Sequence, residues 1–97
     1  METGKILYVR TDYKIDGKLT SKSDFDDHIK YLNSVAKERF FMGGGFNDRT
    51  GGMIVFEATD IDEARKISDN DPIINRGLYR YELVEWEMVL LSKELRD

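Results

Sequence analysis

Four stretches of the chain carry the residue pattern of β-strands, and two carry that of amphipathic helices. Short runs rich in apolar, β-branched and aromatic residues predict strands over residues 5–10, 40–46 and 53–59. The second and third strands flank the turn sequence NDRTGG and should form a hairpin. A longer strand is predicted from about residue 79 to residue 90, because apolar positions alternate with glutamates in the sequence VEWEMVL.

Each predicted helix begins at a recognisable capping signal. Ser23 opens the first one, with Asp26 at the spacing of a capping-box-like pair, and apolar residues then recur every three or four positions until about residue 38 or 39. Asp60 with Glu63 repeats the signal and predicts a second, shorter helix. The chain therefore alternates strands and helices in the order β-α-β-β-α-β.

The remaining segments read as irregular. Residues 11–22 are polar and contain a glycine, so they are predicted as a loop. Pro72, the only proline, follows Asp71 where the second helical pattern ends, and a proline restricts the residue before it to extended backbone. The segment that follows, up to Gly77, is predicted to be irregular as well.

This element order is that of the ferredoxin-like plait, an α+β fold with a four-stranded antiparallel sheet and two helices on one face. A sheet covered on one face alone should alternate apolar with polar residues. The runs ILYV and MIVF are instead apolar at every position. We therefore expect a homodimer, in which a second copy covers the other face and the two sheets pack together as an α+β barrel.

Length and composition fit one small globular domain over residues 1–97. An apolar content of 40% with 11% aromatic residues argues against disorder. A chain of this size buries only about 60–65% of its unfolded surface, so self-association would add useful burial. Composition thus supports the same expectation of a dimer.

The charge and the absence of cysteine exclude several classes of function. A net charge of −4 disfavours nucleic acid and anionic membrane surfaces, which attract basic proteins. The start of the chain lacks the apolar region of a signal peptide, and no apolar run approaches the roughly 20 residues that span a bilayer. We therefore expect a cytoplasmic protein. Without cysteine there is no disulfide, thiolate catalysis or zinc–thiolate site.

His28 and Asp71 each allow a structural and a functional interpretation. His28 lies on the apolar stripe of the first helix, where a hydrogen bond, for example to Asp24, would satisfy it. It is also the one side chain whose ordinary pKa suits a general acid or base at neutral pH. Asp71 fits a helix N-cap, since proline tolerates the first helical position. Residue patterns alone favour the structural interpretation of both.

Other candidate motifs are weaker. The sequence GGGFND lacks the third glycine of a dinucleotide fingerprint, and no P-loop lysine follows, so its glycines indicate either a bulged hairpin or the close approach of a ligand. Arg10 and Arg76 could bind a substrate carboxylate, although scattered arginines are usually solvated. The acidic residues 24, 26 and 27 point in different directions on a helix, so we expect no metal site and no cofactor.

Several of these pieces together resemble the YCII-related (YciI-like) family, whose members are similar to muconolactone isomerase in fold. The matching stretches are HIKYL on the first helix, ERFFMGGGF on the second strand, and GGMIVFEATDIDEARKISDNDPIINRGLYRYELVEW through to the last strand. They cover roughly three quarters of the chain. The ordered set of helix histidine, strand glycines, Asp-Pro and a glycine before the last strand carries the resemblance.

The resemblance implies a dimeric α+β barrel and a His–Asp pair facing a pocket. The family histidine falls on His28 and the family aspartate on Asp71, and the family Gly-Pro falls on Gly44-Gly45, where the proline is missing. An arginine often found shortly before the family histidine has no counterpart here. One known member type eliminates halide from a chlorinated hydroxyhydroquinone, and most members are uncharacterised.

With the resemblance included, we predict a small acid–base enzyme of the lyase or isomerase type that acts on a small polar, aromatic or lactone substrate. His28 and Asp71 are its predicted catalytic residues, with Arg10, Gly44, Gly45 and Arg76 as predicted substrate-binding residues. The alternative is a non-catalytic module that binds small ligands, of the ACT-like kind. A monooxygenase on the same barrel is a third interpretation, because fold does not assign function.

Overall fold

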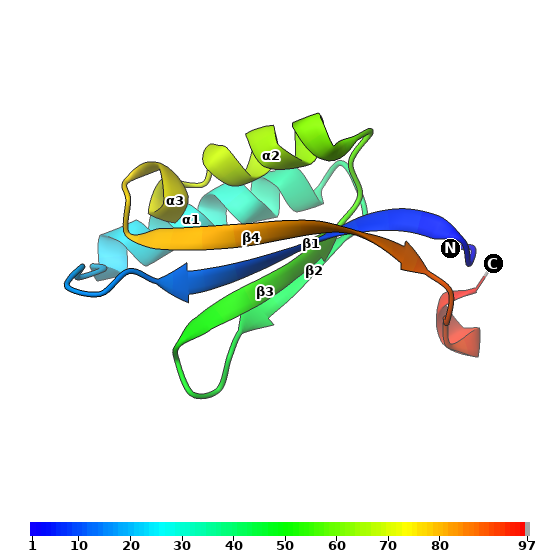
Figure 1. Cartoon of the computed structure of the whole chain (residues 1–97), viewed down its shortest axis with the longest axis horizontal. Helices are drawn as coiled ribbons and strands as arrows, with labels where there is room; N and C mark the ends of the chain where they lie inside the picture. The colour runs from blue at the N-terminus through cyan, green and yellow to red at the C-terminus, as the bar shows by residue number, and fades with distance from the viewer. Residues whose placement is uncertain (97) are drawn as a thin grey trace.

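The computed structural model describes residues 1–96 and has the predicted plait architecture (Figure 1). Its elements follow one another as β1 (Lys5–Lys14), α1 (Lys22–Ala36), β2 (Phe41–Gly45), β3 (Gly51–Phe56), α2 (Ile61–Asp69), α3 (Pro72–Asn75), β4 (Tyr79–Met88) and a 3₁₀ turn, η1 (Lys93–Leu95). All strand pairs are antiparallel, and the sheet order is β2-β3-β1-β4. The predicted fold class is confirmed.

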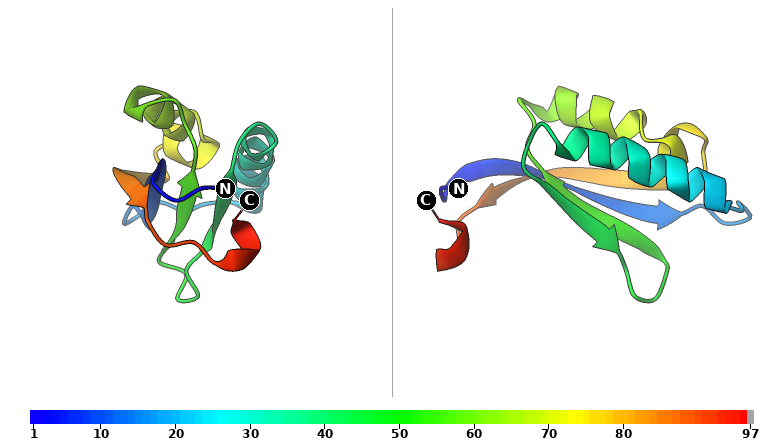
Figure 2. Two further views of the ribbon diagram at one scale, coloured as in Figure 1. Left: turned by 90° about the vertical axis from the view of Figure 1, so that its right-hand side faces the viewer. Right: turned by 180° about the vertical axis from the view of Figure 1, so that it is seen from behind.

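The helices α1, α2 and α3 lie on one face of the sheet, and no α-helix among residues 1–96 covers the other face (Figure 2). Two apolar clusters correspond to these two faces. Tyr8, Ile54, Phe56 and Ala64 form the buried cluster beneath the helices. Leu7, Val55 and Met88 form the second cluster on the open face, and Met1 and Leu91, near the chain ends, are among the residues packed against it. The absence of alternation in β1 and β3 therefore corresponds to apolar packing on both faces.

The first strand is longer than predicted. The segment 11–14, predicted as the start of a loop, continues β1 to Lys14 and pairs with the first residues of β4. The sequence there is polar, but it still alternates, because Asp12 is buried while Thr11 and Tyr13 are only half-buried. The prediction failed because an inward-facing charged residue does not register as a strand signal.

Several further boundaries differ from the prediction. Helix α1 is capped by Ser21, which forms a reciprocal capping box with Asp24, so the predicted cap at Ser23 with Asp26 is wrong. The segment after Asp71, predicted as irregular, contains the one-turn helix α3. Strand β3 begins at Gly51, within the predicted turn, rather than at the predicted start, Met53. The cap of α2 at Asp60, which accepts from the backbone N–H of Glu63 at 2.8 Å, is as predicted.

Met1 and the 3₁₀ turn η1 lie close together beyond one end of the sheet (Figures 1 and 2). The amino terminus of Met1 donates to the carbonyl of Leu95 at 3.1 Å. No helix among residues 1–96 is both long enough and apolar enough to cross a bilayer.

Candidate active site

The candidate active site lies where α1, α3 and β1 meet on the helix-covered face. His28 projects from the second turn of α1, Asp71 is the N-cap of α3, and Arg10 points inward from β1. An ion-pair cluster fastens the two helices together: Arg76, which follows α3, binds Asp24 and Asp27 in the first turns of α1, each at 2.8 Å. The helix that carries His28 is thereby held against the one that carries Asp71.

His28 and Asp71 are in direct contact although they are 43 positions apart in the sequence. The Nδ1 atom of His28 lies 2.8 Å from both carboxylate oxygens of Asp71. Asp71 is fully buried, and its Oδ1 also accepts from the backbone N–H of Ile73 at 3.1 Å, which makes it the cap of α3. The two interpretations of Asp71 are therefore compatible, because one carboxylate both starts a helix and binds the imidazole. Pro72 stands at the first position of that helix.

A buried guanidinium completes the cluster. The Nη2 atom of Arg10 donates to Asp71 Oδ2 at 2.7 Å and to Asp12 Oδ2 at 2.9 Å, while its Nε donates to Asp12 Oδ1 at 2.7 Å. Arg10 is only 1% exposed. Arginine suits this position because its planar fork binds a carboxylate through two parallel hydrogen bonds. Arg10, Asp12, Asp71 and His28 are called the charged cluster below.

The two carboxyl groups of the charged cluster are perturbed in opposite directions. Burial acts to raise the pKa of Asp71, but the hydrogen bond from His28 and the charge of Arg10 outweigh it, so the pKa lies below its ordinary value. Burial raises the pKa of Asp12 above its ordinary value despite its two bonds to Arg10. When both carboxyl groups are ionised and His28 is neutral, two carboxylates share one guanidinium and the cluster carries one excess negative charge.

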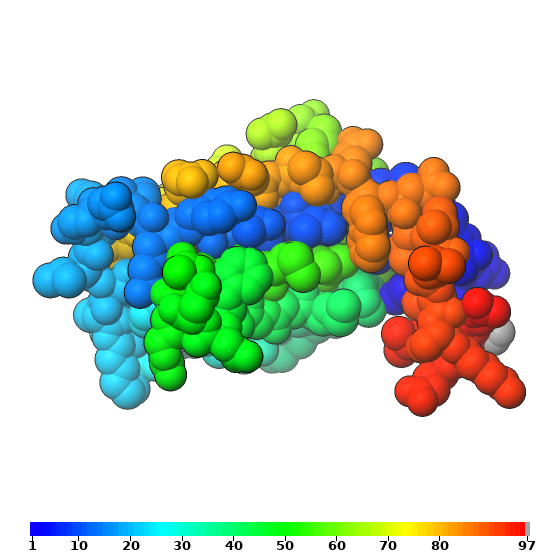
Figure 3. Space-filling view, turned by 60° about the horizontal axis from the view of Figure 1, so that its bottom comes forward, coloured from blue at the N-terminus to red at the C-terminus, as the bar shows by residue number. Residues whose placement is uncertain are grey.

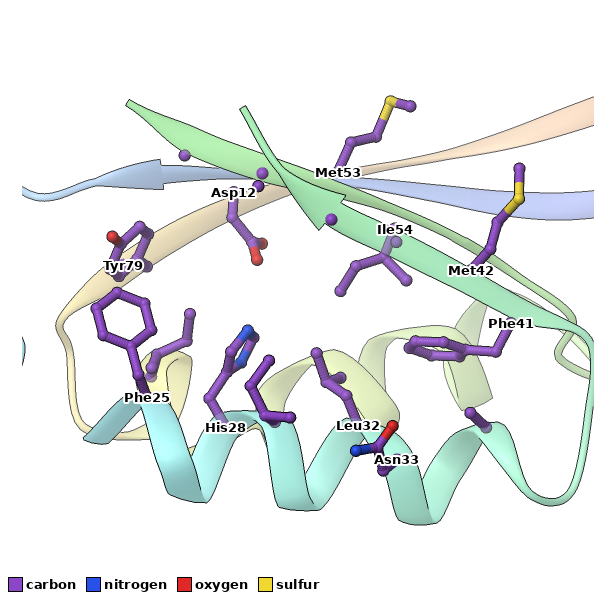
Figure 4. Close-up of a pocket in the computed structure, with 18 residues that line it drawn as sticks. Asp12, Phe25, His28, Leu32, Asn33, Phe41, Met42, Met53, Ile54 and Tyr79 are labelled. Carbon is purple, nitrogen blue, oxygen red and sulfur yellow. The ribbon is translucent and has the colours of Figure 1, made fainter. Parts of the chain in front are cut away.

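A pocket of about 470 Å³ opens beside His28, between α1 and the β2–β3 hairpin (Figure 4). Apolar side chains line most of it, including Phe25, Leu32, Phe41 and Ile54, and five glycines of the hairpin leave bare backbone along one wall. Asp12 and Tyr79 lie with His28 at the polar end. Because Nδ1 of His28 is bound to Asp71, the ring presents Nε2 as the nitrogen available to a ligand.

The structure separates the predicted site residues into three groups. It brings His28, Asp71 and Arg10 into one hydrogen-bonded cluster. Gly44 and Gly45 line the pocket, as a ligand-binding role requires. Arg76 is not among the residues that line the pocket, since its guanidinium binds two carboxylates at the surface. Arg10 does not line it either, so neither arginine is placed to bind a substrate carboxylate directly.

Sequence reasoning missed Asp12, which it placed in a loop. The signal that would have found it is the period of two in β1, since Tyr8, Arg10 and Asp12 share the helix-covered face. The predicted alternative partner of His28, Asp24, instead binds Ser21 and Arg76. Among residues 1–96 no three histidine, aspartate or glutamate side chains are grouped as a metal ion requires.

The sequence matches a known family over most of its length. A YCII-related domain matches residues 6–87, and the chain therefore belongs to the YCII-related family. A curated relative, the uncharacterized protein YjpA of Bacillus subtilis (strain 168), is 36% identical over 62 residues, which cover 63% of this chain and 73% of that protein.

A solved structure has the same fold at lower sequence identity. It is 5-chloro-2-hydroxyhydroquinone dehydrochlorinase (TftG) from Burkholderia phenoliruptrix AC1100 in complex with 2,5-dihydroxybenzoquinone. The two chains share 24% identity with a TM-score of 0.69, over 84% of this chain and 93% of that one. At this level of identity the likeness shows the shared fold.

Proposed function

We propose that this protein is a small acid–base enzyme that moves a proton on a ring-shaped or lactone substrate, with His28 as the general base. The observation that carries the proposal is the orientation of the imidazole: Nδ1 is held by Asp71, and the ring lines the pocket. A bound Nδ1–H fixes the tautomer in which Nε2 has a free lone pair facing the pocket. Asp71 also stabilises the imidazolium that forms when Nε2 takes the proton.

The same arrangement serves two reaction types. In an isomerisation, Nε2 removes a proton from one carbon of the substrate and returns it to another. In an elimination, Nε2 removes a proton while a leaving group departs with its bonding electrons, and the proton is later lost to water. The similar fold of a dehydrochlorinase supports including elimination. A positioned acid or base contributes about 10²–10⁴-fold in rate, which suits substrates with an already acidic proton.

Replacing His28 by alanine should abolish turnover while the fold is retained. The assay measures chloride release from chlorinated hydroxyhydroquinones and ring opening or isomerisation of unsaturated lactones. The matched control is Asn33→Ala, which changes another residue of α1 that lines the pocket but carries no titratable proton. The control should keep most of the activity.

Two outcomes would contradict the proposal. Full turnover in folded His28→Ala would remove His28 from the chemistry. Stabilisation of the wild-type protein by small ligands in a thermal-shift screen, without turnover of any of them, would favour the alternative of a non-catalytic ligand-binding module of the ACT-like kind.

We also propose that the protein is a homodimer, with the open faces of two sheets packed together. That face carries large apolar side chains that are about half exposed: Met42 at 59%, Met53 at 44%, Val84 at 56% and Trp86 at 46%. Strands β4, β1 and β3 run side by side there without a covering helix (Figure 3). Contiguous exposed apolar surface of this kind marks protein contacts.

Replacing Trp86 by glutamate should convert the dimer to a monomer, because the change would bury a charge without a partner in the interface. Leu19→Glu is the matched control, since Leu19 is 92% exposed in the loop before α1, away from the open face. Sedimentation velocity should give a dimer for the wild type and for the control, and a monomer for Trp86→Glu. A monomeric wild type would end the proposal.

A further inference from the structure

Asp12 is a buried carboxylate that the proposed proton transfer does not use. It is 4% exposed, yet it lines the pocket, and its carboxylate points from β1 toward the same hollow as His28 (Figure 4). Both of its oxygens accept from Arg10 on the side away from the pocket. A carboxylate has about four lone-pair positions, so these bonds leave acceptor capacity for a ligand.

The link through Arg10 gives Asp12 a fixed place relative to the base. The single atom Nη2 of Arg10 binds both Asp12 and Asp71, and Asp71 in turn binds His28. Because all four side chains are buried or nearly so, the separation between Asp12 and the imidazole is set by a rigid planar group. A ligand that contacts both must match that separation.

The pocket wall beside Asp12 contains a glycine, Gly45, at a position where the backbone would also accept a side chain. Gly45, Gly52 and Asp12 stand directly opposite one another across the sheet, so they share its helix-covered face. A Cβ on Gly51 or Gly52 would lie impossibly close to backbone oxygens. A Cβ on Gly45 would have only the Gly51 oxygen near it, at 3.8 Å. Gly45 thus leaves space on the pocket side that a side chain would fill.

We propose that Asp12 anchors the ligand by accepting a hydrogen bond from a hydroxyl group on a planar ring, and that the ring lies against the bare backbone at Gly45. This inference rests on the proposed function in one respect, that the pocket beside His28 is the ligand site. It adds the substrate class, a neutral hydroxylated ring, and the two residues that select it.

The charge and the lining of the pocket both favour that class. The charged cluster carries an excess negative charge when both carboxyl groups are ionised and His28 is neutral, so a ligand that bears a carboxylate would be repelled where a neutral hydroxyl would be bound. Phe25, Phe41 and Leu32 supply apolar walls, which favour a ring over a polar chain. A donor hydroxyl then gives the ring one orientation, because an unmatched buried acceptor is costly.

A pair of ligands tests the anchoring without changing the protein. 4-Fluorophenol and 4-fluoroanisole have the same ring and fluorine label, but only the phenol can donate a hydrogen bond. Fluorine NMR titration of the wild-type protein should give a dissociation constant at least about tenfold lower for 4-fluorophenol, as expected for a hydrogen bond to a charged acceptor. Equal affinities, or no saturable binding of 4-fluorophenol, would overturn the proposal.

Two variants test the residues. In Asp12→Asn the single side-chain oxygen is needed by Arg10, so the amide N–H groups would face the pocket and the preference for the phenol should disappear. In Gly45→Ala the added methyl group should weaken both ligands by about tenfold through overpacking. The control is Asn47→Ala, because Asn47 lies in the exposed turn of the same hairpin and is not among the residues that line the pocket.

The control should bind both ligands like the wild type. A phenol preference that survives in folded Asp12→Asn, or equal losses in the two alanine variants, would refute the assignment. Circular dichroism establishes folding in each case, and the Gly45 comparison remains decisive if Asp12→Asn does not fold. These results are independent of turnover, so a failed His28 assignment and a failed Asp12 assignment are distinguishable.

Discussion

Replacing Arg10 by methionine should destabilise the fold by about 3–5 kcal/mol at neutral pH, the usual cost of removing one partner from a buried ion pair. Arg10 is 1% exposed and is the guanidinium that joins Asp12 to Asp71. Methionine fills a similar volume, so the loss of stability would reflect removal of the charge rather than creation of a cavity. Urea unfolding followed by circular dichroism measures it.

The matched control is Arg76→Met. Arg76 also binds two aspartates, but its side chain is 42% exposed, so water replaces the lost contacts and little stability should be lost. Similar losses for the two variants would mean that burial of the charged cluster is not what makes Arg10 important.

The Arg10→Met defect should shrink as the pH falls. In the wild type the pKa of Asp71 is lowered, so its contribution is present above the unfolded value and is lost as the pH falls through the folded value. Without Arg10, burial and mutual repulsion should raise the pKa of both Asp12 and Asp71 above their unfolded values. The folded variant then binds protons more tightly than the unfolded chain, and its stability rises on acidification. A defect of the same size at pH about 5 and about 7 would contradict this.

Replacing Asp71 by asparagine should switch the tautomer of His28 and lower turnover by about 10²–10⁴-fold. The carboxylate accepts from Arg10, from the Ile73 N–H and from the imidazole. Asparagine has one oxygen and an amide group that only donates. If the oxygen satisfies Arg10, the amide faces the ring, so Nδ1 must accept and the proton moves to Nε2. The nitrogen that faces the pocket then has no free lone pair.

Nitrogen-15 NMR of the imidazole reads the tautomer directly, and the single histidine of the chain makes the assignment unambiguous. The control is Asp24→Asn, which changes the acidic residue one turn before His28; it should leave the tautomer as in the wild type. An unchanged tautomer in Asp71→Asn, or a switch in Asp24→Asn, would show that Asp71 does not orient the ring.

The fold could be predicted because its signals are local. The apolar runs of β1 and β3 and the helical stripe after Phe25 depend on neighbours in the sequence, and they place the elements correctly. Boundaries failed where polar residues decide them. Ser21 rather than Ser23 caps α1, because its side chain and that of Asp24 satisfy each other's backbone N–H groups. Either serine fits the pattern, and only the three-dimensional contact distinguishes them.

Only part of the candidate site could be predicted from the sequence. The resemblance placed His28 and Asp71 together, but nothing local indicates that Arg10 lies between two carboxylates 61 and two positions away. Arginine is usually solvated, so its burial here is visible only once β1 is known to extend through Asp12. Arg76 and Arg10 were equally good candidates for substrate binding in the sequence. Arg76 instead forms surface ion pairs that hold α1 against α3.

The charged cluster also constrains how such a protein can diverge. Each of its four side chains is committed to at least one other member, so a substitution at one position is tolerated only with a compensating change elsewhere. The apolar residues of α1 that line the pocket, such as Ile29 and Leu32, are not tied to other side chains by hydrogen bonds in this way. We therefore expect related proteins to acquire new ligands through substitutions in the pocket wall, while the four residues of the charged cluster are retained together.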